Sequence, residues 1–290
     1  MKNFNFLPIL ALSLGCFSCT SDVDEPFNAE ESLPQETFTL TVVHNGKTYD
    51  VPAKTVGDSI VYLDQEFSRI YETEIKGKDD KAVLTYKTDD GRDVVKYYAS
   101  ADELEKENGI EYFENTEETP TFSRGGESLP VPYGIVGRAV LYDDKTFKDR
   151  DITFDISETI FFAVPNLKNH SNFNDKTSSI RVFNLLEPNK LYSPTGTPYR
   201  EEGVNATYGR DLRVCLIGYE NSNYGGKILY CVSREYKPID LSLTLEQMRD
   251  VYHCDWRLSK IGWNDKISSL VFRIIVAKQI DKIYIPHTPI

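Results

Sequence analysis

Histidine, cysteine and glycine-rich motifs are scarce in this chain, which limits the chemistry that it can carry. Its 290 residues include only four His and five Cys. Three histidines lack the spacing that a zinc site needs: His44, His170 and His287. Residues 253–255 read His-Cys-Asp, but adjacent residues of a strand or helix point in different directions and cannot form a Cys–His pair. No phosphate-binding glycine loop or serine nucleophile elbow is present. We therefore expect a protein that is not an enzyme.

Long basic stretches are also missing. The net charge is −12. Residues 20–130 contain 26 acidic and 11 basic side chains, whereas residues 131–290 contain 19 acidic and 21 basic side chains. Without a basic stripe carrying stacking aromatics, nucleic acid is not an expected partner. The unequal charge predicts two units with different surfaces. The chain has 18 Tyr and 15 Phe against two Met and two Trp, which favours β structure.

Apolar runs long enough to span a membrane are absent as well. Lys2 precedes a short apolar run from Phe4 to Leu14, well below the roughly 20 residues of a transmembrane helix. Small residues and two cysteines, Cys16 and Cys19, follow. Residues 1–18 are therefore predicted to be an export signal.

A cysteine directly after such a run resembles the lipobox of bacterial lipoproteins, in which the thiol is diacylated. Cys19 is preferred over Cys16, because a polar acidic leash similar to those of Bacteroidota lipoproteins follows it at residues 20–25. Neither cysteine has Leu three residues earlier. The resemblance implies an outer-membrane lipoprotein of the bacterial cell envelope, surface-exposed or periplasmic, whose only membrane contact is its lipid. The alternative is an ordinary cleaved signal.

The remaining chain divides into a tether, a small domain and a larger domain. Residues 19–35 are polar and predict a flexible tether. Residues 36–115 predict a small α+β domain of unknown role, with an Asn45-Gly46 hairpin and a short helix opened by a capping box at residues 100–103. Proline and glycine in residues 116–133 predict a linker.

An internal repeat follows this linker. Residues 174–179 read Asn-Asp-Lys-Thr-Ser-Ser and residues 264–269 read Asn-Asp-Lys-Ile-Ser-Ser, so five of six positions are identical. Each hexamer leads into a strand-like apolar run. Upstream, Tyr142 and Phe147 have the same spacing as Tyr219 and Tyr224, and Asp149 stands where the second copy has Gly226. A repeat of this kind determines the architecture of the region.

These paired elements resemble the βγ-crystallin Greek key, an aromatic corner followed by a calcium-binding signature. The resemblance covers residues 134–278, about half of the chain. It implies a mainly β fold, a two-Greek-key sandwich preceded by the small α+β domain. Insertions near residues 187–210 and 236–254 interrupt the pattern, and residues 279–290 form a C-terminal tail.

The resemblance also implies two Ca²⁺ ions shared between facing loops, the only cofactor expected. The implied side-chain ligands are Asp175, Ser178, Asp265 and Ser268. Lys176 and Lys266 would contribute main-chain carbonyls. Further carbonyls would come from the hairpins, near Asp143 and Glu220. Asn174 and Asn264 would brace the loops. Oxygen is the donor that Ca²⁺ prefers, with six to eight ligands at about 2.3–2.6 Å. Alternatively, both loops only turn the chain through Asx-turns.

The three cysteines after the leader leave two arrangements open. Cys215 and Cys231 are symmetric about Asn223, the centre of a predicted hairpin. We expect a Cys215–Cys231 disulfide with Cys254 free, since an exported protein can form disulfides. The alternative is three buried free thiols.

The functional expectation is a calcium-binding envelope lipoprotein whose crystallin-like domain is a binding or structural module. Its partner would be an unknown protein or glycan, contacted through the long polar insertion at residues 187–210, because loops of this length are often functional. The alternative is a secreted protease inhibitor, since some domains of this family resemble metalloproteinase inhibitors. A purely structural spacer is a third possibility.

Overall fold

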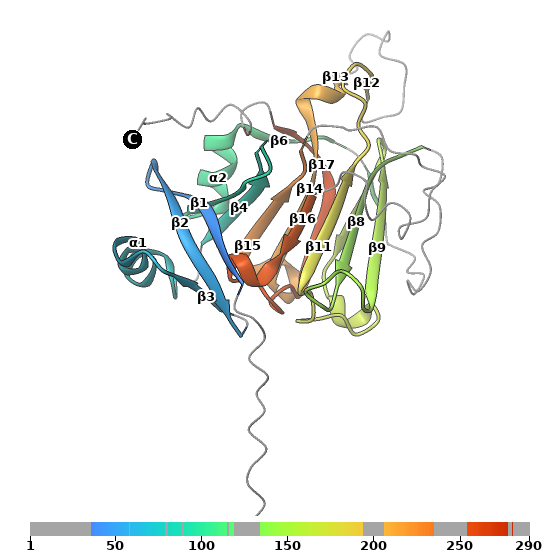
Figure 1. The fold of residues 1–290 in the computed structure, drawn as a ribbon. Coiled ribbons are helices and arrows are strands. Elements are labelled where there is room, and N and C mark those ends of the chain that lie inside the picture. Colours follow the sequence, from blue (N-terminus) through green and yellow to red (C-terminus); the bar gives the residue numbers. More distant parts are fainter. Residues whose placement is uncertain are drawn as a thin grey trace, which may run out of the picture. The chain divides into compact units, whose positions relative to one another are not determined.

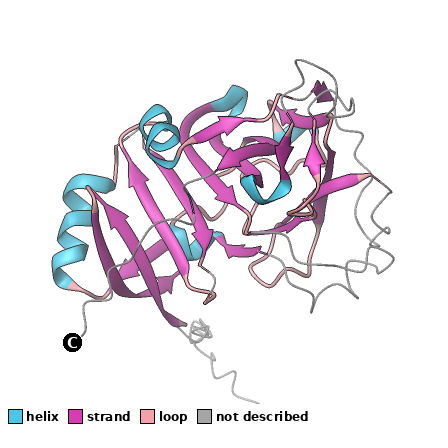
Figure 2. Cartoon of the chain, turned by 90° about the horizontal axis from the view of Figure 1, so that it is seen from above, coloured by secondary structure: helices cyan, strands magenta, loops and turns pink. Residues whose placement is uncertain are grey.

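A computed structural model describes residues 36–57, 59–78, 81–88, 90–114, 116–118, 134–193, 206–234, 254–277 and 280. This part of the chain is mainly β, with short helices at its margins (Figure 1, Figure 2). The mainly β fold class is thus confirmed. No helix within it has the length and apolar character of a membrane span. The predicted signal, the lipidation cysteines and nearly all of the tether and tail lie outside the described residues.

The chain enters the sheet through three antiparallel strands, β1 (Thr37–His44), β2 (Lys47–Val56) and β3 (Ser59–Tyr62). Asn45 and Gly46 have φ values of 50° and 72°, as a tight hairpin requires at both central positions. His44 and Lys47 therefore pair across the turn. The predicted hairpin is confirmed.

Two short helical segments, a second hairpin and a third helical segment follow: α1 (Gln65–Ile70), η1 (Tyr71–Ile75), β4 (Ala82–Lys87), β5 (Asp93–Tyr98) and α2 (Ala101–Asn108). The Ser100 hydroxyl accepts from the Glu103 amide at 3.2 Å, and the Glu103 carboxylate accepts from the Ala99 amide at 2.9 Å. These reciprocal bonds satisfy amides at the helix start, and Gly109 ends α2 at φ 58°. The predicted capped helix is confirmed.

The remaining elements are mostly strands. They are β6 (Ile110–Tyr112), β7 (Thr116–Glu118), β8 (Ile135–Tyr142), β9 (Asp151–Ser157), β10 (Ile160–Val164), η2 (Leu167–Asn169), β11 (Ser179–Asn184), β12 (Leu191–Tyr192), β13 (Thr207–Tyr208), η3 (Gly209–Asp211), β14 (Leu212–Asn221), η4 (Ser222–Tyr224), β15 (Gly225–Val232), β16 (Cys254–Arg257), η6 (Leu258–Ile261) and β17 (Ser269–Ala277). Among the strands of the described residues, only β12 and β13 pair outside the large sheet.

The two repeats exchange one strand each within that sheet. Its order is β16-β11-β8-β9-β10-β17-β14-β15-β4-β5-β1-β2-β3, with β6 added to β17 and β7 added to β10. In the first repeat β11 pairs with β8, and in the second β17 pairs with β14. However, β10 of the first repeat pairs with β17, and β16 of the second pairs with β11. Neither repeat therefore completes its sheet alone.

The strands before residue 116 continue the same sheet. Strand β4 runs parallel to β15, with Ala82 opposite Ile228 and Thr85 opposite Cys231. Residues 35–290 form one compact unit. The predicted small domain and the repeat region thus share one sheet, while residues 119–133 of the predicted linker lie outside the described residues.

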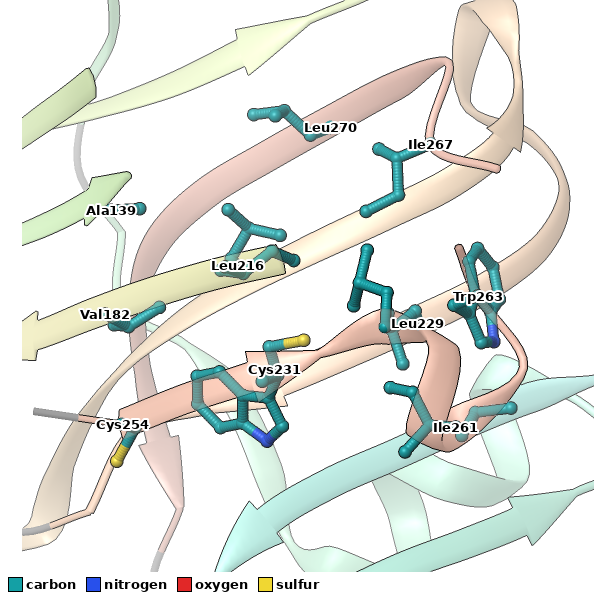
Figure 3. Packing of buried hydrophobic residues seen from close by; sticks show 14 of the residues in the cluster. Ala139, Val182, Leu216, Leu229, Cys231, Cys254, Ile261, Trp263, Ile267 and Leu270 are labelled. Atoms are coloured by element: carbon teal, nitrogen blue, oxygen red, sulfur yellow. The ribbon is translucent and has the colours of Figure 1, made fainter. Parts of the chain in front are cut away.

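They also share one hydrophobic core. A single cluster of buried side chains includes Leu40 of β1, Phe67 of α1, and Trp256 and Trp263 of the second repeat. Figure 3 shows the part of this cluster around Trp263 and Ile261. A second cluster lies on the other face of the sheet and includes Leu104 of α2. Burial of apolar side chains stabilises by about 25 cal/mol per Å², so a common core links the stability of both halves.

Replacing Leu40 by Ala tests this link. Leu40 is fully buried, and the cavity left behind is expected to lower the free energy of unfolding by roughly 2–5 kcal/mol. The chain contains two tryptophans, both in the second repeat, so their fluorescence during urea unfolding reports on the other half of the sheet. We expect that transition to shift to lower urea, whereas the exposed-site control Lys47→Ala leaves it in place. An unshifted tryptophan transition in Leu40→Ala would mean that the halves unfold independently.

Candidate metal centre

The two repeated hexamers form two loops of nearly identical conformation. We call residues 174–179 loop 1 and residues 264–269 loop 2. Asp175 has φ 51° and Asp265 has φ 52°, in the left-handed region that Asp tolerates better than most residues. Each loop ends in the first residue of a strand, β11 or β17. The nearly identical hexamers thus give turns with the same left-handed aspartate.

Backbone hydrogen bonds place the loops against each other. The Asp175 amide donates to the Ile267 carbonyl at 3.2 Å, and the Asp265 amide donates to the Thr177 carbonyl at 3.0 Å. Both bonds cross from one loop to the other, and they are related by exchange of the repeats. The arrangement therefore has a local twofold character.

The 3-10 turns that precede the loops extend this pattern. The Leu167 amide of η2 donates to the Ser268 carbonyl at 2.9 Å. The Leu258 amide of η6 donates to the Ser178 carbonyl at 3.0 Å. Each loop is thus held by the turn leading into the other loop.

The first serine hydroxyl of each loop donates to the aspartate of the other loop. Ser178 Oγ lies 2.9 Å from Asp265 Oδ1, and Ser268 Oγ lies 2.7 Å from Asp175 Oδ1. The four predicted side-chain ligands are therefore brought together as two Ser–Asp pairs. Each pair combines residues from both repeats, so a site built on either pair needs both loops.

The two asparagines contact the second oxygen of each carboxylate. Asn174 Nδ2 donates to Asp175 Oδ2 at 2.5 Å, and Asn264 Nδ2 donates to Asp265 Oδ2 at 2.8 Å. With Oδ1 facing the serine and Oδ2 held by the amide, the orientation of each carboxylate is fixed at both oxygens. Each asparagine thus contacts the carboxylate of the next residue within its own loop.

The hairpins that carry Asp143 and Glu220 are attached to the loops on both sides of these residues. The Ser178 amide donates to the Tyr142 carbonyl at 2.8 Å, and Ser179 Oγ donates to the Asp144 carbonyl at 2.6 Å. In the second repeat the Ser268 amide donates to the Tyr219 carbonyl at 2.9 Å, and Ser269 Oγ donates to the Asn221 carbonyl at 2.6 Å. Residues 143 and 220 therefore lie between two anchored carbonyls.

The side chains of these hairpin residues face cations of their own hairpin. Asp143 Oδ2 lies 3.0 Å from the Arg150 guanidinium, and Glu220 Oε1 lies 3.7 Å from Lys227 Nζ. Their backbone carbonyls, which were the predicted donors, are independent of these ion pairs.

The lysines inside the loops differ in their surroundings. Lys176 is half-buried, whereas Lys266 Nζ donates to the Gly262 carbonyl at 2.5 Å. Burial lowers the pKa of Lys266, with a further lowering from Lys227 and an opposing effect of Glu220. For both residues only the backbone carbonyl can serve a cation, because an ammonium has no acceptor.

The aromatic corners are formed in both repeats. Tyr142 and Phe147 pack edge to face with ring centroids 5.8 Å apart, and Tyr219 and Tyr224 do so at 5.4 Å. Phe147 and Tyr224 share a φ of 61°. Gly226 has φ 77°, but Asp149 is not among the residues with positive φ, so the first hairpin does not need glycine at that position.

The donor set fits a hard divalent cation. Every predicted ligand atom is an oxygen, as Ca²⁺ prefers. Two oxygens near loop 1, Asp143 Oδ1 and Thr177 Oγ1, are buried and have no hydrogen-bond partner within the described part of the chain. In the same residues no group of three or more His, Cys, Asp and Glu side chains comes together. A site here would therefore combine one carboxylate with hydroxyl and backbone oxygens.

Sequence reasoning missed the role of Arg181. Its guanidinium lies 5.0 Å from the Phe147 ring and 5.8 Å from the Tyr142 ring, and it pairs with Asp255 at 3.0 Å. Such cation–π contacts contribute about 0.5–2 kcal/mol. The second repeat has Val271 at the equivalent position. No motif singled out Arg181, because its ion pair with Asp255 depends on the pairing of β16 with β11.

The insertions are described only in part. In the 187–210 insertion, the Glu187 amide donates to Tyr192 Oη at 2.7 Å, and the Gly209 amide donates to the Lys190 carbonyl at 2.9 Å. A Cβ on Gly209 would lie only 2.1 Å from the Glu187 carbonyl oxygen, so this close approach requires glycine. Residues 194–205, and residues 236–253 of the other insertion, lie outside the described residues.

The predicted Cys215–Cys231 disulfide is wrong. Cys215 pairs with Val232, and Cys231 pairs with Leu216, because a bulge between Tyr219 and Asn221 shifts the register by one residue. A one-residue shift turns a side chain to the opposite face of a sheet. Cys215 accordingly belongs to the cluster beneath α2, whereas Cys231 belongs to the shared core. Within the described residues Cys215, Cys231 and Cys254 are all free and buried.

Comparison with known proteins adds no relative: no protein-family model, curated protein or solved structure matches this chain. The resemblance described above therefore depends on the repeated residues and their geometry.

The reactivity of the three thiols offers a direct check on the β14–β15 register. Burial raises the pKa of all three cysteines, that of Cys254 to about 11, so the reactive thiolate is scarce at neutral pH. In a chain with Cys16 and Cys19 replaced by Ser, we expect no reaction with Ellman's reagent in the native state. Without reductant, unfolding in guanidinium should release all three thiols. A single reactive thiol after unfolding would instead reveal a disulfide.

Proposed function

We propose that this protein is a calcium-binding lipoprotein of the bacterial cell envelope and that residues 134–278 form a βγ-crystallin-like pair of Greek keys. The observation that carries the proposal is the reciprocal contact between the loops, in which Ser178 faces Asp265 and Ser268 faces Asp175. A chance similarity of two turns would not require their acidic and hydroxyl groups to meet in this exchanged manner.

The strand pairing supports the same proposal. Each repeat contributes a strand, β10 or β16, to the partner repeat. This exchange brings both hexamers to one place, so ligands from two distant parts of the sequence can surround one ion. Two such places follow from the local twofold relation, and two ions per chain are therefore proposed.

The chain offers each ion a defined set of donors. One ion would be held by Ser178, Asp265 and the carbonyl of Lys176, with a carbonyl from the hairpin at Asp143. The other would be held by Ser268, Asp175 and the carbonyl of Lys266, with a carbonyl from the hairpin at Glu220. Bound calcium would link the two repeats electrostatically.

The donor set also indicates the strength of binding. Each site contains a single carboxylate, and a lysine lies in each loop. Extracellular calcium modules of low ligand charge commonly have a Kd of about 10⁻⁴–10⁻³ M, and we expect this range or somewhat tighter. The existing Ser–Asp hydrogen bonds hold both loops close together before the ion arrives, which lowers the entropic cost of binding.

Calorimetric titration of the protein with calcium tests the proposal. We expect two ions per chain in the wild type and one in either Ser178→Ala or Ser268→Ala, because each substitution removes a donor from a different site. At about 10 mM calcium, roughly ten times the weaker expected Kd, each site stabilises the fold by about 1.4 kcal/mol. The wild type should therefore show a calcium-dependent rise in melting temperature that the double variant, with both Ser178→Ala and Ser268→Ala, lacks.

Ser157→Ala is the matched control, because Ser157 is a half-buried turn serine in another part of the sheet. It should bind two ions. Absence of both binding heat and thermal shift in the wild type at that calcium concentration would refute the calcium proposal.

The N-terminal sequence carries the envelope part of the proposal. Cys19 is the proposed lipidation site, followed by the tether of residues 19–35, and the lipid is the only membrane contact. In this arrangement the crystallin-like domain is a binding or structural module for an unknown protein or glycan outside the membrane.

Metabolic labelling with radioactive palmitate examines the anchor. Label is expected in the wild-type protein and in Cys16→Ala, but not in Cys19→Ala. Label that persists in Cys19→Ala and disappears in Cys16→Ala would move the lipid to Cys16. No label in any of the three proteins would contradict lipidation altogether.

A further inference from the structure

The segment that leads into loop 2 packs against the N-terminal strands. Helix η6 ends at Ile261, directly before Gly262, Trp263 and loop 2, and η6 contacts β3 and β2. A Cβ added to Gly262 would lie 3.6 Å from Tyr71 Oη and 3.7 Å from Ile60 Cγ2. The N-terminal strands and η1 therefore lie beside the chain that positions Asp265, with no room for more than one added methyl group between them.

Charged side chains join the same two parts. The Glu36 carboxylate, one residue before β1, lies 2.6 Å from Arg257 Nη1 and 2.9 Å from Lys260 Nζ. The Lys260 ammonium also lies 4.6 Å from the ring centroid of Phe38. The first residues of β1 are thus tied to both ends of the turn that precedes loop 2.

The first repeat contacts the same strands through the hairpin beside the other proposed calcium site. Lys145 belongs to the hairpin that carries Asp143, and its ammonium donates to the Gly57 carbonyl at 3.1 Å. Gly57 lies in the turn between β2 and β3. Both proposed calcium sites are therefore bordered by segments that touch the β2–β3 hairpin.

Backbone hydrogen bonds connect these contacts directly to the loops. The Leu258 amide is bonded to the Ser178 carbonyl, and the Trp263 amide is bonded to the Leu258 carbonyl at 2.8 Å. A change in the spacing of loops 1 and 2 must therefore move η6, because η6 is attached to both. Trp263 and Ile261 are buried in the core that includes Leu40 and Ile60, and close-packed cores transmit such movements.

We infer that calcium binding between loops 1 and 2 is coupled to docking of strands β1–β3 on η6, so that calcium tightens the attachment of the N-terminal strands. The inference rests on the proposed calcium binding. Coupling between two equilibria is reciprocal, so loosening the docked strands weakens calcium binding by the same factor. Strand β1 is also the element into which residues 1–35 lead, so the calcium state would act on the part of the fold next to the proposed tether.

Hydrogen–deuterium exchange of the full chain, measured with and without calcium beside the calorimetric titration, tests the coupling. We expect amides of residues 47–56, 59–62 and 254–263 to exchange severalfold more slowly with calcium. Amides of the separate β12–β13 pair serve as the internal reference and should be unchanged. If calcium binds but exchange in β2 and β3 does not respond, the coupling is refuted while the proposed function stands. If calcium does not bind, both proposals fall.

The reciprocal measurement uses Glu36→Gln, which removes the charge that joins β1 to Arg257 and Lys260. Partly exposed ion pairs of this kind contribute modestly, so we expect a calcium Kd about two- to fivefold weaker. Asp90→Asn is the matched control, because Asp90 pairs with Arg92 at 2.8 Å in the β4–β5 turn, and its Kd should equal that of the wild type. Equal affinity in Glu36→Gln and the wild type would also overturn the coupling.

Discussion

The reciprocal hydrogen bonds between the two acidic loops determine how the rest of this structure is arranged. Ser178 with Asp265, and Ser268 with Asp175, can meet only if the two repeats face each other. That requirement brings together residues almost 90 positions apart in the chain, as the separation of 87 between Ser178 and Asp265 illustrates. The backbone bonds from Leu167 and Leu258 then fix the turns before each loop. The contacts between these two short hexamers accompany long-range strand pairing, whose register the buried apolar faces hold.

The same requirement explains the pairing of β10 with β17 and of β16 with β11. The turn that places each loop opposite its partner is preceded by a strand that must lie in the partner's sheet. Once this frame exists, β15 presents an open edge to β4, and the N-terminal strands continue the sheet from there. An unpaired edge would expose backbone donors and acceptors, and β4 satisfies those of β15.

Much of this arrangement was predictable because it depends on local sequence. The Asn45-Gly46 hairpin, the capped helix after Ser100 and the two aromatic corners each follow from residues a few positions apart. The neighbourhood of the two loops was predictable because the repeat is nearly identical. The parallel pairing of β4 with β15 was not, since no local pattern specifies which distant edge a strand will join. The thiol pairing failed for a smaller reason: one bulged residue near Tyr219 shifted the β14–β15 register, so Cys215 and Cys231 point to opposite faces of the sheet.

The exchanged strands make the two repeats inseparable in one further sense. A chain with only one repeat would have a loop without its acceptor carboxylate and a strand without its partner in the other repeat. Two such chains could restore every missing pairing by exchanging that strand, as in a domain-swapped dimer. The present fold is the covalently joined form of that dimer. Because the partner repeat is always supplied by the same molecule, its assembly does not depend on protein concentration.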